Sequence, residues 1–473
     1  MEKRPPAVMP TAIPRVWLVF ADQLTTRIFV ESRIVDGLRR ALPDSLTALF
    51  LVHEKHIRPW RDRLEGIDVL ELDELIPAEV PARERIARRI DHALDRRIGF
   101  YPLAIRHSQR HGFHDGRWAP GHTYPFLDTN RAGRLPRWHS VEKASAAWHM
   151  SPHRYVPASL LRRMQDDCDA LVLTNPQTQP STPFLAAARR LHLPTVGYIA
   201  SWDHPVGKGI VSPYLDSYVV QNETMRDDLQ RFHGVDGDRV TVTGWPQTDV
   251  YHRQRTQAEY ADLLARLGLA PDKPVVLYAG NAPHNMPYEP NLVARLVSWW
   301  RETGANTRFS LLFRPHPYDE QASERFRAAI DDPDAAFQNR SWTDLEDLAT
   351  LLQHVDCVIA NAGTIMLEAL ANDRPTVCVT FDEGAPPGRT WAELNLLGVH
   401  YRALMQSDAF LRAASFDELV EALGRSLETP GELAVERAGV ARDVVGEMDG
   451  RAAERVVEAI CVAVGLDRVK TVA

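Results

Sequence analysis

A turn of small residues between a strand and a helix is the strongest candidate for a binding site in this sequence. The turn is Asn361-Ala-Gly-Thr364, and the helix that it opens carries Glu368 one turn further along. Free backbone N–H groups at a helix start attract anions, so Gly363 and Thr364 could hold a phosphate or diphosphate. Glu368 on the same helix face could then accept hydrogen bonds from a ribose. The same residues also fit an ordinary turn in which Thr364 caps the helix.

Two further loops follow predicted strands in the same half of the chain. Arg314-Pro-His316 puts a guanidinium and an imidazole at the end of one strand, where they could bind an oxyanion. Gly280 and Asn281, with His284 close behind, follow another strand, and the glycine would let a ligand approach the backbone. In both cases the alternative is a plain loop, with Arg314 solvated and His316 packed.

The first half of the chain carries a candidate for proton transfer. Asp203 and His204 follow the strand predicted at 195–199, and either side chain could take a proton from an acceptor hydroxyl. Lys208, which lies between two glycines, could contact an acceptor phosphate. The alternative is a rigid turn in which Asp203 caps the backbone.

A group of histidines competes with these loops as the site of chemistry. His107 and His111 would share a helix face, and with Asp115 they could bind a metal ion. Nothing fixes the spacing beyond that pair, and Gly112 and Gly116 weaken the helix. We therefore expect no metal, and we interpret the region as a polar insertion that touches the acceptor.

The stretch from Asn361 to Val379 resembles the donor-binding motif of the GT-B glycosyltransferase superfamily. It is most similar to the branch that contains CDP-glycerol glycerophosphotransferases and the nonhydrolysing UDP-N-acetylglucosamine 2-epimerases. These proteins share a small-residue turn, a helix with a glutamate, a second turn and a strand. In them the first turn binds the donor's diphosphate and the glutamate binds its ribose. The resemblance implies those roles for Gly363, Thr364 and Glu368.

Other segments extend this resemblance. An R-x-H-P loop, like the one that holds Arg314 and His316, is frequent in the same relatives. The first loop of the C-terminal domain of GT-B proteins, here at Gly280, touches donor phosphate or acceptor. Asp203 and His204 lie where glycerophosphotransferases have a W-H-G-T-P-x-K-x-x-G loop whose histidine is the proposed base. The histidine here is displaced by one position, so either residue could inherit that role.

The sequence departs from both branches at specific positions. Ala362 and Gly363 stand where glycerophosphotransferases commonly carry two hydroxyl residues. Residues 21–23, Ala-Asp-Gln, replace the Gly-x-Arg-Pro-Glu loop that epimerases carry after their first strand. The resemblance therefore leaves the donor open between a nucleotide sugar and a CDP-polyol.

Strands that alternate with helices are expected to position all of these loops. Short apolar runs at 16–20, 170–174, 274–279 and 309–313 are typical of parallel strands buried on both faces, and amphipathic helical patterns separate them. This alternation predicts an α/β protein with two Rossmann-like doubly wound domains that face a cleft. Ligands would bind at the carboxyl edges of the two sheets. The GT-B resemblance implies the same fold.

The expected domain boundaries follow from breaks in this alternation. We expect an N-terminal acceptor-side domain at 1–250, with an insertion at about 99–157 where the regular pattern is lost. A linker at 251–273 leads to a nucleotide-donor-binding domain at 274–445. The GT-B resemblance implies that the last helix, within 446–473, crosses back onto the first domain.

Composition narrows the class of partner. A length of 473 residues exceeds what one core supports, and 44% hydrophobic with 25% charged residues fits a folded globular protein. The net charge of −8 disfavours nucleic acid as a partner, and four scattered cysteines suggest neither disulfides nor a zinc site. The sequence shows no signal peptide and no apolar stretch of about 18 residues, which predicts a cytoplasmic protein. The Arg-rich stretch 83–97 fits a solvated helix or peripheral contact with the inner face of the membrane.

These features together predict a metal-independent transferase that uses no cofactor. It would move a glycosyl or polyol-phosphate group from a nucleotide-activated donor to a hydroxyl of a carbohydrate or lipid-linked acceptor, in the synthesis of cell-envelope polysaccharide or glycoconjugate. Arg314, His316 and the helix start at Thr364 would offset the charge on the leaving group. Asp203 or His204 would be the base. The alternatives are a nonhydrolysing nucleotide-sugar epimerase and a noncatalytic protein that binds nucleotide sugars or carbohydrates.

Overall fold

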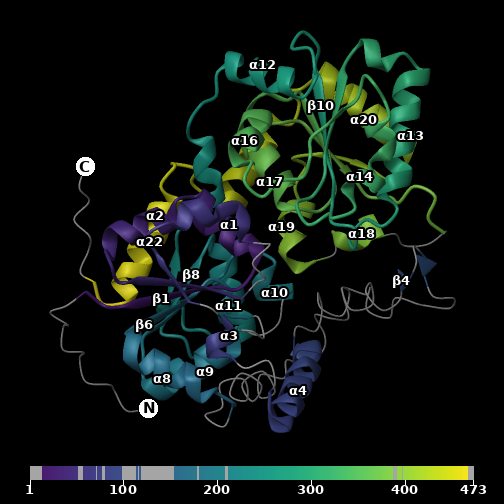
Figure 1. Cartoon of the computed structure of the whole chain (residues 1–473). Helices are drawn as coiled ribbons and strands as arrows, with labels where there is room; N and C mark the ends of the chain where they lie inside the picture. The colour runs from purple at the N-terminus through teal and green to yellow at the C-terminus, as the bar shows by residue number, and fades with distance from the viewer. Residues whose placement is uncertain are drawn as a thin grey trace. The chain divides into compact units, whose positions relative to one another are not determined.

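The chain forms two compact units, each built on its own parallel sheet (Figure 1). The computed structural model describes residues 13–51, 57–70, 72–76, 80–98, 113–114, 117–118, 154–177, 181–207, 211–386, 391–396 and 398–466. The first unit contains the residues before 99, residues 154–247 and residues 451–466, and the second is built around residues 248–450. Every helix within the described ranges is too short or too polar to cross a bilayer.

The sheet of the first unit has seven parallel strands in the order β3-β2-β1-β6-β7-β8-β9. The order reverses beside β1 (Val16–Phe20), whose neighbours are β2 (Leu46–Phe50) and β6 (Ala170–Leu173). All five residues of β1 are buried, as expected for a strand with helices on both faces. The other strands are β3 (Asp68–Leu70), β7 (Thr195–Tyr198), β8 (Ser217–Val220) and β9 (Val240–Val242).

The sheet of the second unit has six parallel strands in the order β12-β11-β10-β13-β14-β15. The strands are β10 (Val275–Ala279), β11 (Ser310–Arg314), β12 (Ala336–Phe337), β13 (Cys357–Ala360), β14 (Thr376–Val379) and β15 (Leu411–Ala413). Counted along the chain, this is the doubly wound order 3-2-1-4-5-6, which reverses between β10 and β13. The prediction of two doubly wound α/β domains is therefore confirmed.

Helices separate the strands in both units. In the first unit they are α1 (Gln23–Glu31), α2 (Ile34–Ala41), α3 (Leu72–Leu75), α4 (Ala82–Ile98), α8 (Ala158–Asp167), α9 (Thr182–Leu191), α10 (His204–Gly207), α11 (Glu223–His233) and α22 (Ala452–Ala463). In the second they are η5 (Pro246–Tyr251, which begins at the boundary), α12 (Gln257–Arg266), α13 (Glu289–Glu302), α14 (Ala322–Arg325), α15 (Arg327–Ile330), α16 (Leu345–His354), α17 (Thr364–Ala371), α18 (Trp391–Asn395), α19 (Arg402–Met405), α20 (Phe416–Glu428) and α21 (Ala434–Val440).

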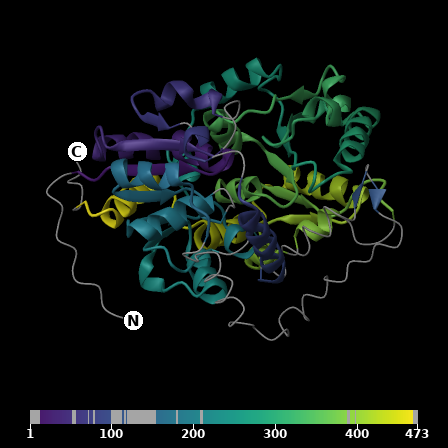
Figure 2. The ribbon, with the colours of Figure 1, turned by 60° about the horizontal axis from the view of Figure 1, so that its bottom comes forward.

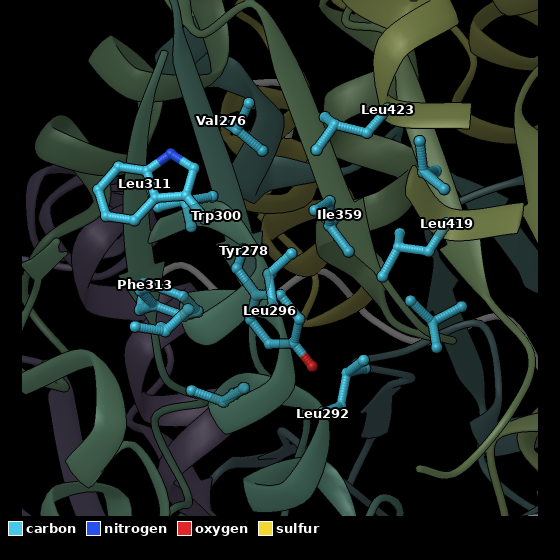
Figure 3. Close-up of a cluster of buried hydrophobic side chains, with 14 of the residues drawn as sticks. Val276, Tyr278, Leu292, Leu296, Trp300, Leu311, Phe313, Ile359, Leu419 and Leu423 are labelled. Atoms are coloured by element: carbon cyan, nitrogen blue, oxygen red, sulfur yellow. The ribbon is translucent and has the colours of Figure 1, made fainter. Parts of the chain in front are cut away.

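A hydrophobic core fixes one face of the second sheet (Figure 3). Leu292, Leu296 and Trp300 recur every four residues along α13, so one stripe of this helix faces the strands. Tyr278 of β10 and Phe313 of β11 pack against each other beneath it, with ring centroids 5.5 Å apart. Because the core holds these strands rigidly, the loops at their carboxyl ends have fixed starting points.

The segment expected as a linker, 251–273, is packed onto the second unit. Its helix α12 contacts α16. Gln353, at the end of α16, donates from Nε2 to the backbone oxygen of Tyr251 at 2.9 Å and accepts from the backbone N–H of Arg255 at 2.8 Å. The segment therefore has its own packed helix and fixed hydrogen bonds, and is part of the second unit.

The insertion expected at about 99–157 lies mostly outside the described residues, and so do His107 and His111. Within it the structure describes residues 154–157 and the antiparallel pair of β4 (Phe113–His114) and β5 (Arg117–Trp118).

Helix α22 packs on the first unit although it follows the second in sequence. It contacts α2, β7 and β8, and Figures 1 and 2 both show it beside the purple N-terminal segments. Gly37 of α2 makes this contact close, because a Cβ atom there would lie 2.6 Å from Val457 Cγ2. Arg455 Nε also donates to the backbone oxygen of Thr243 at 2.7 Å.

Gly37→Ala should lower the free energy of unfolding of the first unit by about 1–3 kcal/mol, because the new methyl group would overlap Val457. Alanine inside a helix otherwise gains about 0.5–1 kcal/mol over glycine, so a loss identifies the overlap. Adding Val457→Ala should recover most of the loss. Urea unfolding of the full chain measures both effects. A Gly37→Ala variant at least as stable as the wild type would contradict this packing.

Candidate functional site

The loops after β10 and β13 meet where the strand order of the second sheet reverses. Asn281, which follows β10, donates from Nδ2 to the backbone oxygen of Ala362 at 2.9 Å and to Asn361 Oδ1 at 3.3 Å. Both asparagines are buried. Ligands of open parallel sheets bind in the crevice at such a reversal. The structure thus brings together two of the loops that the sequence singles out.

Asn361 is the junction of this region. Its Nδ2 donates to the backbone oxygens of Val379 at 2.7 Å and Ala392 at 3.0 Å. Its Oδ1 accepts from Asn395 at 2.9 Å, and Asn395 also donates to the backbone oxygen of Asn285 at 2.8 Å. The sequence indicates Asn361 only as part of a small turn, and no motif indicates Asn395. The one sequence signal for the junction is Asn361 itself, an amide side chain among small residues directly before a helix.

The start of α17 has no side-chain cap within the described part of the chain. Gly363 occupies the N-cap position, and Thr364 is the first helical residue. The alternative in which Thr364 caps the helix is therefore not what the structure has. The first N–H groups of α17 are not used by a capping side chain, so they suit an anion.

The two glycines that the sequence singles out have different surroundings. A Cβ atom on Gly280 would lie 2.6 Å from Phe326 Cζ, so packing alone requires glycine there. Among the described residues, the nearest atom to a Cβ on Gly363 would be Ile365 Cγ2 at 3.9 Å, and the φ of 174° is open to any residue. Packing within the described part of the chain therefore does not require glycine at position 363.

Glu368 is buried and pairs with a residue that sequence reasoning assigned to the linker. The hydroxyl of Tyr251 donates to Glu368 Oε2, and both side chains are less than a tenth exposed. The two residues are 117 positions apart, so no local pattern could reveal the contact.

Arg314 is buried rather than solvated. Its Nη1 donates to Gln338 Oε1 and to Asp344 Oδ2, each at 2.6 Å. Asp344 directly precedes α16. The guanidinium thus ties the end of β11 to the chain that follows β12.

His316 lies two residues beyond Arg314 in the same loop. Its Nδ1 accepts from the backbone N–H of Tyr318 at 3.1 Å, and the two rings stack with centroids 5.6 Å apart. A neutral ring that accepts at Nδ1 carries its proton on Nε2. His284, in the loop after β10, is exposed.

A buried ion cluster supports the loops after β10 and β11. Arg325 donates to Glu289 Oε2 at 2.7 Å and to Asp319 Oδ2 at 2.9 Å. Glu289 Oε1 accepts from the backbone N–H of Asn281 at 3.0 Å and from the Tyr278 hydroxyl at 3.2 Å. Burial raises the pKa of Glu289 to about 7, although Arg325 acts in the opposite direction.

The loop after β7 carries the proton-transfer candidates of the first unit. Asp203 Oδ1 accepts from the Ser201 hydroxyl at 2.6 Å. His204 is buried at the start of α10, and its backbone oxygen accepts from Gln177 Nε2 at 2.9 Å. Lys208 lies outside the described residues. The structure thus places Asp203 and His204 at the carboxyl edge of the first sheet.

His233 of α11 makes hydrogen bonds to the chain on both sides of this loop, and no motif in the sequence indicates this role. Its Nδ1 accepts from the backbone N–H of Val211 at 3.1 Å, and its Nε2 lies 2.6 Å from the backbone oxygen of Pro205. Burial lowers the pKa of His233 to about 4, so the ring is neutral at physiological pH.

The reversal point of the first sheet, between β1 and β6, also carries a polar pair. Asn175 Nδ2 donates to Asp22 Oδ2 at 3.0 Å, and Asp22 Oδ1 caps α1 by accepting from the Thr25 N–H at 2.8 Å. Asp22 follows β1, and Asn175 follows β6.

Among the described residues, no three His, Cys, Asp or Glu side chains gather as a metal site.

When the pH is raised from about 5 to about 8, the free energy of unfolding should fall more for the wild type than for the Glu289→Gln variant. The folded carboxyl, with its pKa raised from 4.5 to about 7, retains a proton that the unfolded chain has released. Its stabilising contribution is complete below the unfolded value and is lost as the pH rises through the folded one. Thermal unfolding across this range tests the difference, with Glu302→Gln at the exposed end of α13 as the control. Parallel profiles for wild type and Glu289→Gln would refute it.

Solved structures of similar fold include UDP-GlcNAc 2-epimerases. The one from Neisseria meningitidis, bound to UDP-GlcNAc, has a TM-score of 0.53 and 11% identity over 94% of this chain and 99% of that one. The one from Methanocaldococcus jannaschii, in complex with UDP-GlcNAc and UDP, has a TM-score of 0.51 and 10% identity over 94% and 99%. The wall teichoic acid polymerase TagF has a TM-score of 0.45 and 14% identity over 64% and 84%. At such identities the first two similarities concern the fold alone, and they fit the predicted GT-B fold.

Comparison with curated proteins finds no match. A family model described as CDP-Glycerol:Poly(glycerophosphate) glycerophosphotransferase matches residues 211–462, which is more than half of the chain. The matched region contains the three loops after β10, β11 and β13 that the sequence singles out. The resemblance to this branch and the prediction of a transferase are confirmed, and the chain belongs to the CDP-glycerol:poly(glycerophosphate) glycerophosphotransferase family.

Proposed function

We propose that this protein transfers a glycerol phosphate or related polyol phosphate from a CDP-linked donor to a hydroxyl group of a polymeric or lipid-linked acceptor, in cell-envelope synthesis. The observation that carries this proposal is the family match across residues 211–462. Within that range lies the reversal point between β10 and β13, with the uncapped start of α17 beside it. This arrangement suits a diphosphate-containing donor.

The reaction balances without a further reactant. The acceptor oxygen attacks the phosphorus that carries the glycerol, and a new P–O bond forms. The bridging P–O bond of the diphosphate breaks, CMP leaves, and the hydroxyl proton passes to a base. Glycosyl transfer would instead break the bond between the sugar and the diphosphate and release a nucleoside diphosphate. The nucleotide product therefore separates the two kinds of donor.

On the second unit, the N–H groups at Gly363 and Thr364 would bind the diphosphate, and Glu368 would accept hydrogen bonds from the ribose. His316 would donate from Nε2 to a phosphate oxygen. The charge of Arg314 is already balanced by Asp344, so we assign Arg314 to shaping the loop after β11. Gly280, Asn281 and His284 would complete the site through the loop after β10.

On the first unit, we assign the base to His204. Histidine is the side chain that most often serves as a general base. Asp203 Oδ1 already accepts a hydrogen bond from the Ser201 hydroxyl, so we treat Asp203 as the second candidate. Lys208 would contact an acceptor phosphate.

Incubation with CDP-glycerol and a polyol-phosphate acceptor should release CMP, and His204→Gln should lower turnover by about 10²–10⁴-fold. Nucleotide affinity should not change, because the donor site lies on the second unit. Asp203→Asn is the matched comparison and should have the smaller effect. Chromatography of the nucleotide products and calorimetric titration with CDP measure the two quantities.

Three results would contradict the proposal in different ways. Release of a nucleoside diphosphate from a nucleotide sugar would indicate glycosyl transfer. Epimerisation of a UDP-sugar without transfer would indicate the epimerase alternative. Nucleotide binding without turnover, unaltered by His204→Gln, would indicate a noncatalytic protein.

Gly363→Ala should weaken CDP binding by about tenfold or more while leaving the melting temperature unchanged. The added methyl group would come no closer than 3.9 Å to an atom of the described residues, but it would project where the diphosphate approaches the backbone. Calorimetric titration and thermal unfolding measure the two effects separately. Unchanged affinity would place the diphosphate elsewhere.

A further inference from the structure

Tyr251 holds the carboxylate that the proposed function assigns to the donor ribose. We infer that its hydroxyl orients Glu368, so that Tyr251 is a positioning residue that sets the preference of the donor site for ribonucleotides over deoxyribonucleotides. This inference rests on the proposed function, in which Glu368 accepts hydrogen bonds from the ribose hydroxyls. It concerns a residue outside the loops that the sequence singles out.

The position of Glu368 along α17 suits it to bind the ribose of a nucleotide. Glu368 lies four residues, or about one helical turn, after Thr364 at the start of α17. In a nucleoside diphosphate the ribose is the group joined directly to the phosphates. A diphosphate on the first turn of α17 therefore brings the ribose to the next turn, where a carboxylate can accept from its vicinal hydroxyls.

A glutamate needs a fixed orientation to do this selectively. Its side chain has several rotatable bonds, and ordering it costs conformational entropy. The Tyr251 hydroxyl donates to Oε2 and so fixes the plane of the carboxylate before a nucleotide arrives. An ionised carboxylate can accept about four hydrogen bonds, so the bond from tyrosine does not exclude bonds from a ribose.

Tyr251 is itself held by its backbone. Gln353 Nε2 donates to its carbonyl oxygen at 2.9 Å, and Arg255 Nη2 donates to the preceding carbonyl, that of Val250, at 3.2 Å. The ring is only 3% exposed. The hydroxyl therefore reaches Glu368 from a segment anchored to α16, and its direction is set by the fold.

The second unit also supplies a matched control. Tyr260 is buried to a similar degree, at 5% exposed, and its ring stacks on His354 with centroids 4.9 Å apart. Within the described part of the chain, its hydroxyl has no hydrogen-bond partner. Tyr260→Phe therefore removes the same atom from a comparable environment without touching Glu368.

The test compares the affinities of the full chain for CDP and 2′-deoxy-CDP by calorimetric titration. We expect the wild type to bind CDP about tenfold more tightly than the deoxynucleotide, and Tyr251→Phe to reduce this ratio about three- to tenfold by weakening CDP alone. Tyr260→Phe should keep the wild-type ratio. A ratio measured on one preparation is independent of the fraction of folded protein, so a loss of stability in Tyr251→Phe would not obscure the result.

Glu368→Gln separates failure of this inference from failure of the proposed function. If Glu368→Gln leaves the ratio of the two affinities unchanged, the ribose assignment in the proposed function is wrong. It is also wrong if the wild type binds neither nucleotide. If Glu368→Gln abolishes the ratio while Tyr251→Phe behaves like Tyr260→Phe, the positioning role of Tyr251 is overturned and the ribose assignment stands. Loss of the ratio in both variants supports the inference.

Discussion

The buried ion cluster of Glu289, Arg325 and Asp319 is the constraint on which the donor side of this protein depends. Two carboxylates and one guanidinium out of water are tolerable only when their hydrogen bonds are complete, so no member can move alone. Glu289 also receives the backbone N–H of Asn281, and the Asn281 side chain holds the carbonyl of Ala362. The hydrogen bonds of Glu289 and Asn281 thereby fix the backbone at the start of α17.

The strands and the loops that follow them could be predicted from sequence for a simple reason. Parallel strands buried on both faces are continuous apolar runs, and polar residues just after such runs must lie at the carboxyl edge. The predicted loops at Gly280, Arg314 and Asn361 do follow β10, β11 and β13. The partners of Arg314 and Glu368 could not be predicted, because Asp344 and Tyr251 reach them through tertiary packing.

Gly280 and Gly363 show a difference that sequence motifs cannot reveal. In the sequence, Gly280 and Gly363 are equivalent small residues after strands. In the structure Phe326 fills the space beside Gly280, whereas the nearest described atom to a Cβ on Gly363 would lie 3.9 Å away. Packing requires the first glycine and does not require the second. Only coordinates distinguish the two cases.

The return of α22 to the first unit has a consequence for the order of synthesis. Strands β1 to β9 leave the ribosome first, but the faces of α2, β7 and β8 that α22 covers stay bare until the whole second unit has been made. The buried side chains of α22 include Val456 and Ile460, so the waiting surface is apolar. The part of the protein made first is thus completed last, and the nascent chain exposes this apolar surface throughout translation of the second unit.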